Sequence, residues 1–367
     1  MKEDWAYTEE CLHPLADSLG HLLAMIRPHV SARLIDGPDW VHMLDRALLI
    51  PQSMAAFPFG FEIPLNDPRP RADLGVSLVG DSLTSKIYKD RGAVADADRS
   101  DKSLAWLLDE MDQEDSLLCQ VVGKKALLEF DIDANVRGSS LEPGIFLYPV
   151  DDVLASGTHR TKEIGAIHDA LVFAGGWDQS ETEFEQLNDL HLKLLPNTTI
   201  RAVGTFPSRK RVIRVAVTGF RKAEEVKTYL DRVGWPGTAS VVAEAVTFLD
   251  DRQAYAYLGI HFDVTPTGLG PALGLSIFAQ EKEWLKDIKY WIPAVKAIDE
   301  WGLAVPEKLS ELMEWSTGSA SLFTPKGLMM FVRGIHHLKF SIANDEFNAI
   351  KAYTFFLMMS VRSTIKA

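Results

Sequence analysis

Five stretches of the chain have the alternating pattern of β-hairpins, and this repetition restricts the possible folds more than any other feature. In each stretch, two runs alternate apolar with other residues, and turn-forming residues such as Gly, Pro, Asn and Asp separate the runs. The five stretches are 59–80, 127–150, 201–220, 257–278 and 337–357. Five hairpins supply ten antiparallel strands.

The segments between the hairpins have apolar residues three and four positions apart, which predicts amphipathic helices. Helical patterns occur in 5–30, 39–49, 101–122, 182–195, 222–234, 238–251 and 281–301. Thr182 and Glu185 predict a capping box at the start of one helix. We therefore predict a single domain over 1–367, with N-terminal helices in 1–50 and five hairpin–helix repeats in 51–360.

A sheet of ten strands either leaves two open edges or closes on itself. One face of the predicted strands is apolar and suits a covering layer of helices, whereas the alternate face is polar. In a closed ten-stranded barrel the polar face lines an interior wide enough for a ligand. We predict an α/β fold in which repeated αββα units form a ten-stranded antiparallel β-barrel with its helices outside. The alternative is an α+β fold with an open or split antiparallel sheet.

The polar face contains many ionisable and aromatic residues. By the period of two, the inward-facing set is Glu62, Asn66, Glu129, Asp131, Asp133, Arg214, Thr218, Tyr257, His261, Asp263, His337, Lys339, Ser341, Lys351 and Tyr353. With Asp73, which has the same phase, it holds six acids and three bases. A diphosphate would sit poorly among six ionised carboxylates unless a metal intervened.

Charge and cysteine content exclude several classes of protein. The formal net charge of −13 argues against a nucleic-acid or anionic-membrane partner. Residues 318–367 depart from this balance, since their six Lys and Arg outnumber Asp345 and Glu346 and give +4. The N-terminus lacks the apolar region of a signal peptide, and two cysteines give no disulfide framework. We predict a soluble, cytoplasmic protein; the oligomeric state is not indicated.

This organisation resembles the PT-barrel (ABBA) aromatic and indole prenyltransferases over about residues 40–360, on the repeated hairpins and on two local motifs. "PFGFEIPLN" resembles the first barrel strand of the indole enzymes, in which a Glu accepts the proton of the indole; the matching residue is Glu62. "IKAYTFF" resembles the family's Lys-x-Tyr strands and supplies Lys351 and Tyr353. "GIFLYP" keeps only the tyrosine of that motif, Tyr148.

The resemblance implies transfer of a prenyl group from an allylic diphosphate to an aromatic or peptide acceptor in specialised metabolism. Cationic side chains would neutralise the leaving diphosphate, and aromatic faces would shield the allyl cation. The predicted catalytic residues are Glu62, Tyr257 and Tyr353. The predicted substrate- or diphosphate-binding residues are Arg214, Lys339, Lys351, Tyr148, His261 and His337. No cofactor is required in this hypothesis, and Mg²⁺ is optional.

The acids also permit a metal site. Asp131 and Asp133 are two positions apart on one strand and point the same way, and Asp263 has that relation to His261. Carboxylate oxygens are suitable ligands for Mg²⁺. Two other functions stay open: the same barrel could perform non-prenyl chemistry on a modified ribosomal peptide, or it could be a non-catalytic binding or scaffold protein.

Overall fold

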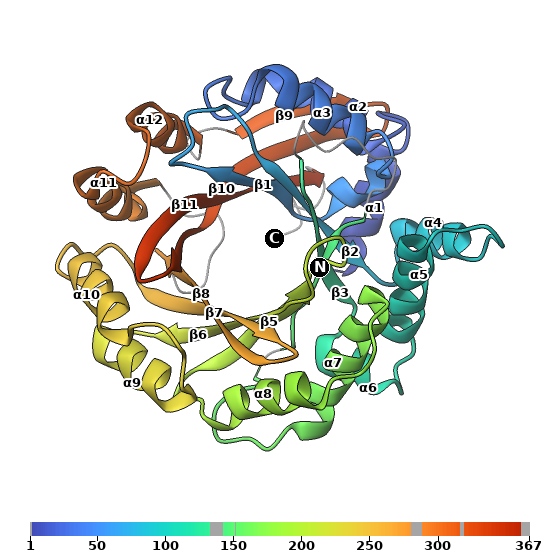
Figure 1. Ribbon diagram of the computed structural model, residues 1–367. Coiled ribbons are helices and arrows are strands. Elements are labelled where there is room, and N and C mark those ends of the chain that lie inside the picture. Colours follow the sequence, from blue (N-terminus) through green and yellow to red (C-terminus); the bar gives the residue numbers. More distant parts are fainter. Residues whose placement is uncertain (1, 133–141, 151, 280–287, 316–318, 361–367) are drawn as a thin grey trace.

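The computed structural model describes residues 2–132, 142–150, 152–279, 288–315 and 319–360. Within these residues, ten antiparallel strands form a closed barrel, and helices surround it (Figure 1). The barrel strands are β1 (Phe59–Pro64), β2 (Asp73–Val79), β3 (Lys125–Phe130), β4 (Gly144–Leu147), β5 (Thr199–Thr205), β6 (Ile213–Phe220), β7 (Tyr257–Thr265), β8 (Gly268–Phe278), β10 (Gly327–Ala343) and β11 (Glu346–Ser360). All five predicted hairpins form, and the predicted ten-stranded barrel is confirmed.

The last hairpin closes the ring. Strand β11 pairs with β1, with Glu62 opposite Tyr353 and Pro64 opposite Lys351. Strand β10 pairs with β11 along one side and with β8 along the other. Every other barrel strand pairs with its neighbours in chain order. The alternative of an open or split sheet is therefore wrong.

One strand was not predicted. Strand β9 (Ser319–Thr324) pairs with the beginning of β10, from Gly327 to Val332, and so extends the sheet beside the ring. Strands β10 and β11 are the longest of the described strands, at 17 and 15 residues, so they reach beyond their pairing with β8. Sequence periodicity located only the second part of β10, because the pattern is clear only from His337 onward.

The apolar face of the barrel is buried beneath the outer helices. These helices are α1 (Lys2–Leu12), α2 (Leu19–Ile26), α3 (Gly37–Ala47), α4 (Leu83–Gly92), α5 (Arg99–Asp112), α6 (Leu117–Val122), α7 (Thr161–Gly175), α8 (Glu181–Leu192), α9 (Ala223–Val233), α10 (Ala239–Asp250), α11 (Ile292–Trp301) and α12 (Pro306–Trp315). Aromatic pairs join the two layers. Phe61 of β1 packs on Trp315 of α12, with ring centroids 6.1 Å apart. Phe262 of β7 packs on Tyr229 of α9 at 5.8 Å.

Strand β6 illustrates how alternation selects the two faces. Ile213, Val215 and Val217 have no exposed surface, and they belong to the hydrophobic core between sheet and helices. Arg214 lies between them and points to the opposite face, since successive strand residues alternate. β-Branched residues suit this pleated and half-buried environment. The predicted apolar face is confirmed in this way on each barrel hairpin that carried it.

The turn between β10 and β11 is set by two residues in the left-handed region. Asn344 and Asp345 have φ values of 54° and 60°, and the flanking Ala343 and Glu346 pair with each other. Two positive φ values are the hallmark of a type I′ turn, in which Asn and Asp are favoured residues. Asp345 also accepts hydrogen bonds from the backbone N–H and the hydroxyl of Thr238, which precedes α10.

The helix predictions are correct in most places and incomplete in three. Helices α4, α7 and α12 lie outside the predicted segments. The predicted capping box at Thr182 is displaced by two residues, because the side chain that caps α8 is that of Ser180, which accepts from the backbone N–H of Glu183. Among the described residues, no helix combines the length and apolar composition needed to cross a bilayer.

Candidate functional site

The polar face of the strands lines the interior of the ring, which we call the lumen. The side chains of Arg214, Asp263 and Lys351 keep 34%, 28% and 30% of their surface exposed, although their strands belong to a closed ring. These three side chains are therefore accessible to water or to a small ligand.

Glu62 lies at the centre of a hydrogen-bonded group on β1 and β11. The ammonium group of Lys351 forms an ion pair with Glu62 Oε1, and the hydroxyl of Tyr353 also donates to this carboxylate. Burial alone would raise the pKa of Glu62, but the nearby charges of Lys351 and Lys339 and these hydrogen bonds lower it to about 2. Glu62 is therefore ionised and already occupied as an acceptor.

Two arginines are paired with acids near β6. Arg214 Nε lies 3.5 Å from Asp263 Oδ1 on the neighbouring β7, and the two residues are directly opposite each other. Arg209, between β5 and β6, donates from Nε to Asp131 Oδ2 at 2.7 Å. Both guanidinium groups lie over the ring of Phe206, at 5.1 Å and 3.7 Å from its centroid. Much of the positive charge on this side of the lumen is therefore balanced.

Lys339 is a lumen cation with no ion pair among the described residues. Its side chain crosses β8 at Gly274, where an added Cβ would lie 2.6 Å from Lys339 Cε. Its ammonium group lies 5.9 Å from the ring centroid of Tyr353. Burial and the nearby Arg214 lower the pKa of Lys339 to about 8. Lys339 therefore carries a charge at neutral pH that is available to an anionic ligand.

Glu129 is a lumen acid without a hydrogen-bond donor among the described side chains. Burial and the charge of Glu62 raise the pKa of Glu129 to about 8. Asp73 on the adjacent β2 accepts a hydrogen bond of 2.9 Å from the backbone N–H of Ile132. Burial and Glu62 raise the pKa of Asp73 to about 6. The three acids at this place thus have separated pKa values, an arrangement that is frequent at functional sites.

Four aromatic rings form a row across four strands. Tyr353 stacks on His337 with centroids 4.0 Å apart, and Phe278 lies 5.2 Å from His337 at a small interplanar angle. Phe278 in turn stacks on Tyr257 at 4.5 Å with an angle of 4°. The strand register causes this row, because His337 pairs with Tyr353 and Tyr257 with Phe278. Stacked in this way, the rings cover one another's faces, and the Tyr353 end of the row lies beside Lys339.

The histidines of the lumen are neutral. The ring of His261 forms a hydrogen bond of 2.7 Å with the hydroxyl of Ser276. Burial, Lys339 and Arg214 lower the pKa of His261 well below its ordinary value. A register shift in β10 brings His336 beside His337, with 2.7 Å between their Nδ1 atoms. Burial, with the charges of Lys125 and Arg201, lowers the pKa of His336 to about 4.

The structure brings together most of the residues predicted from the sequence. Glu62, Lys351, Tyr353 and Lys339 adjoin one another, and His337 and Tyr257 continue from them along the row. Tyr148 lies elsewhere on the wall, directly after β4, which is the strand next to Glu129. Burial and the charge of Glu129 raise the pKa of Tyr148 above its ordinary range.

The predicted metal ligands do not form a cluster in the described part of the chain. Asp131 and Asp263 are paired with different arginines, and Asp133 lies outside the described residues. No group of three or more His, Cys, Asp or Glu side chains is arranged there to hold a metal ion. We therefore do not assign Asp131 or Asp263 as metal ligands.

Three residues of the site had no predicted role. Phe278 completes the aromatic row, and its place on the inward face could have been found by applying the period of two within β8, where Leu273, Leu275 and Ile277 form the apolar face. Glu129 and Asp73 have the phase of inward acids in the sequence. Their separate functions could not be distinguished there, because the difference depends on which acid has a cationic partner.

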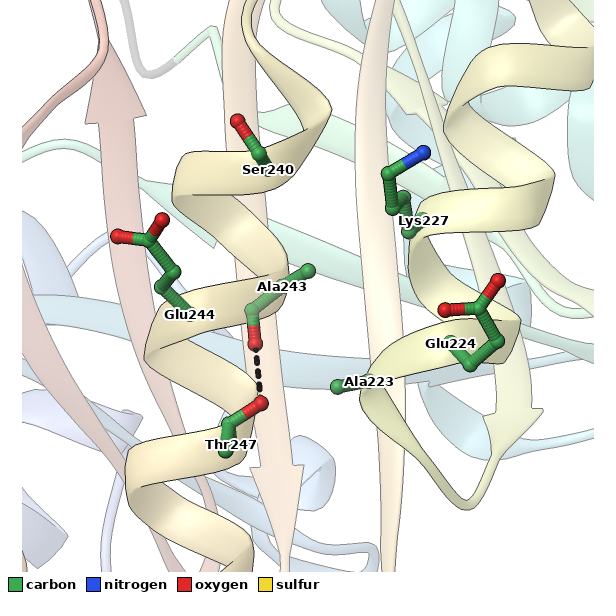
Figure 2. A pocket seen from close by; sticks show the side chains of 7 residues that line it. All are labelled: Ala223, Glu224, Lys227, Ser240, Ala243, Glu244 and Thr247. Atoms are coloured by element: carbon green, nitrogen blue, oxygen red, sulfur yellow. Dashed lines mark hydrogen bonds between the residues drawn. The ribbon is translucent and has the colours of Figure 1, made fainter.

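A shallow groove on the outside of the barrel is a second candidate. It lies between α9 and α10, has a volume of about 330 Å³, and is lined by Ala223, Glu224, Lys227, Ser240, Ala243, Glu244 and Thr247 (Figure 2). Its only cation, Lys227, is paired with Asp231, and the hydroxyl of Thr247 donates to the carbonyl of Ala243. The groove shares no residue with the lumen and offers no reactive arrangement.

No model of a protein family matches the chain, and no curated protein matches its sequence. Solved structures do match. The apo form of the prenyltransferase PriB is 12% identical, with 93% of this chain and 96% of that chain covered and a TM-score of 0.53. The 5-dimethylallyltryptophan synthase of Streptomyces coelicolor is 13% identical to this chain. The match includes 93% of this chain and 97% of the synthase, with a TM-score of 0.47.

A third match is the 6-dimethylallyltryptophan synthase of Micromonospora olivasterospora in complex with DMASPP and Trp. It is 12% identical to this chain. The match includes 96% of this chain and 95% of the synthase, with a TM-score of 0.48. The likeness to PriB and the closed ring of ten strands show that this chain has the PT-barrel fold of aromatic prenyltransferases. The resemblance predicted from the hairpins is thereby confirmed at the level of the fold.

Proposed function

We propose that this protein transfers a prenyl group from an allylic diphosphate to an aromatic acceptor inside its barrel. One observation carries the proposal: the ammonium group of Lys339, which has no ion pair among the described residues, lies beside the row of Tyr353, His337, Phe278 and Tyr257 inside a PT barrel. A cation next to stacked π faces suits a ligand with an anionic head and a carbon chain that becomes cationic.

In the proposed reaction, the bond between C1 of the prenyl group and the diphosphate oxygen breaks, and its electron pair leaves with the diphosphate. Lys339 and Arg214 stabilise the negative charge that develops on the leaving group. The face of Tyr353 that is turned away from His337 stabilises the allyl cation, and Tyr257 at the other end of the row is the second predicted aromatic residue. A carbon of the acceptor ring then attacks C1. Lys351, Tyr148, His261 and His337 complete the predicted binding wall.

The acceptor is an aromatic small molecule or an aromatic side chain of a peptide. Dimethylallyl and geranyl diphosphates should each be incubated with indoles, phenols and peptides that contain Trp or Tyr. The expected product is the acceptor with the mass of one added prenyl group. Loss of binding to dimethylallyl diphosphate in calorimetry with wild-type protein would overturn the proposal.

Lys339→Met tests the residue that carries the proposal. We expect dimethylallyl diphosphate to bind at least about tenfold more weakly, because a charge-assisted contact to phosphate contributes roughly 1.5–3 kcal/mol. Lys227→Met in the outer groove is the matched control and should bind normally. Equal affinities for the two variants would contradict the role of Lys339.

A further inference from the structure

Among the described residues, the carboxyl group of Glu129 has no ion-pair or hydrogen-bond partner, and it has a chemical use that the sequence did not assign. We propose that Glu129, rather than Glu62, removes the proton from the alkylated acceptor ring. This inference rests on the proposed function, since a proton is lost only after a prenyl group has been added to the ring. It identifies the proton acceptor of that reaction.

Glu62 is poorly suited to this step. Its carboxylate already accepts from the ammonium group of Lys351 and from the hydroxyl of Tyr353. To take a proton from a substrate, it would have to give up at least part of this ion pair. Its low pKa also makes it a weak base, whereas an efficient general base has a pKa near the working pH. Glu62 instead holds Lys351 and Tyr353 in place.

The wall beside Glu129 has room for a substrate. Gly75 on β2 and Gly144 on β4 are its two directly opposite neighbours, so no side chain flanks it on either strand at that level. A Cβ added at Gly75 would meet no atom closer than 3.9 Å, so no side chain is packed against the backbone at this part of the wall. At Gly144 the ring of Phe206 covers the backbone, 2.6 Å from the position of an added Cβ. A flat acceptor could therefore approach Glu129 from the side of β2.

Charged groups face Glu129 from both sides of the lumen. Glu62 comes from β1, and Tyr148 directly follows β4. Asp73 lies two positions from Gly75, the partner of Glu129 on β2, and Lys125 lies four positions before Glu129 on β3. Arg214, Lys339 and Lys351 approach from β6, β10 and β11, and Tyr353 is also close enough to interact with it. The three cations favour the ionised form, but burial and Glu62 outweigh them, so the pKa of Glu129 is raised to about 8. Below that pH the carboxyl is mostly protonated, and its basic form grows as the pH rises.

The proton step balances without a further reactant. The acceptor ring carbon that has bonded to C1 is tetrahedral and carries one hydrogen, and the ring is cationic. An oxygen of ionised Glu129 takes this proton, and the C–H electron pair restores the aromatic system. The products are the neutral prenylated ring, protonated Glu129 and the diphosphate, and Glu129 returns its proton to water for the next turnover.

Glu129→Gln and Glu62→Gln separate the two acids. Wild-type kcat should rise with pH along an acidic limb up to about pH 8, above which Lys339 loses the charge that stabilises the leaving group. In Glu129→Gln, kcat should fall by roughly 10²–10⁴-fold and the acidic limb should disappear, whereas Kd for dimethylallyl diphosphate should stay close to wild type. In Glu62→Gln the limb should remain and move to lower pH, because the charge that raises the pKa of Glu129 has been removed.

Two further readouts distinguish a proton acceptor from a structural residue. A ring-deuterated acceptor should show a larger primary isotope effect on kcat in Glu129→Gln than in wild type, since proton loss, which limits the wild-type rate only in part, becomes fully rate-limiting. Glu129→Asp keeps a carboxylate and should recover part of the rate and the acidic limb. Loss of the limb in Glu62→Gln, or its persistence in Glu129→Gln, would overturn the inference. Either of these two outcomes can be observed only if the wild-type protein binds the diphosphate and forms product. Failure of the inference is therefore distinguishable from failure of the proposed function, in which the wild-type protein does not bind the diphosphate.

Discussion

Most charged side chains on the inner wall of the barrel lie within ion-pairing distance of an opposite charge. Glu62 is paired with Lys351, Arg214 with Asp263, and Arg209 with Asp131. Charges taken out of bulk water are stable only with such compensation. Within the described chain Lys339, Glu129 and Asp73 lack an ion pair at this distance. Asp73 accepts a backbone hydrogen bond from Ile132 instead, whereas Lys339 and Glu129 remain for contact with a ligand.

Lys351→Met should destabilise the fold, because it leaves the Glu62 carboxylate without its cation. We expect the free energy of unfolding to fall by about 1–3 kcal/mol, less than for a fully buried pair because both groups keep some exposure. The double variant Glu62→Gln/Lys351→Met should regain most of this loss. Urea denaturation checks both values. A double variant that is as unstable as Lys351→Met would contradict the explanation.

The affinity for dimethylallyl diphosphate should depend on pH through Lys339. Because burial and Arg214 lower the pKa of Lys339 to about 8, its positive charge is present below this pH and is lost above it. The Kd should therefore increase as the pH rises beyond about 8. Calorimetry between pH 6.5 and 9.5 measures this change. The Lys339→Arg variant keeps its positive charge over this pH range, so its Kd should not change with pH in this way. The same increase of Kd with pH in both proteins would exclude Lys339 as the cause.

At the level of elements, strand pairing determines which rings meet. Tyr257, Phe278, His337 and Tyr353 come from β7, β8, β10 and β11, and they form a row because each is level with the next. A shift of one residue in any of these pairings would turn a ring to the opposite face. The site therefore depends on turns that fix the register.

The turn at Asn344 and Asp345 is the clearest test of this dependence. Asn344→Val places a β-branched residue at φ 54° and should lower the free energy of unfolding by roughly 1–2 kcal/mol. Asn344→Gly is the matched control, since glycine adopts this conformation freely. Thermal or urea unfolding of the two variants checks the difference. Equal stability of both would show that the turn does not constrain the hairpin.

At the level of the whole molecule, the barrel supplies its own cations to a diphosphate. Lys339 and Arg214 lie inside a ring whose strands fix their positions. We therefore expect dimethylallyl diphosphate to bind in the presence of EDTA, with at most a modest gain on addition of Mg²⁺. Calorimetry in both conditions measures this. Binding that appears only with Mg²⁺ would require a different set of contacts for the diphosphate.

The sequence was sufficient to predict the barrel, because closure follows from the number of strands and from the alternation on each of them. Ile213, Val215 and Val217 show this directly: one face is entirely apolar and must be buried. Strand β9 was missed because "SASLFT" has a weak alternation, and the turn at Pro325 and Lys326 that joins it to β10 was not recognised. Helix α7 was missed because its apolar residues are spread over much of its circumference.

The candidate site could be predicted only in part. The inward phase of Glu62, Lys339, Lys351 and Tyr353 follows from the period of two, so their membership of one wall was accessible. Which acid pairs with which base depends on strand neighbours that are far apart in the chain. The ion pair of Glu62 and the lack of a partner at Glu129 could therefore be learned only from the folded structure.

The closing contact of the ring joins residues that are 289 positions apart, Glu62 and Lys351. Lys339, Lys351 and two of the four stacked rings belong to the hairpin that is translated last among the described strands. A nascent chain on the ribosome consequently holds no assembled chamber until this hairpin has emerged and inserted between β8 and β1. Contacts of such long separation also slow folding, so the unclosed cylinder exposes two strand edges to other chains while synthesis is being completed.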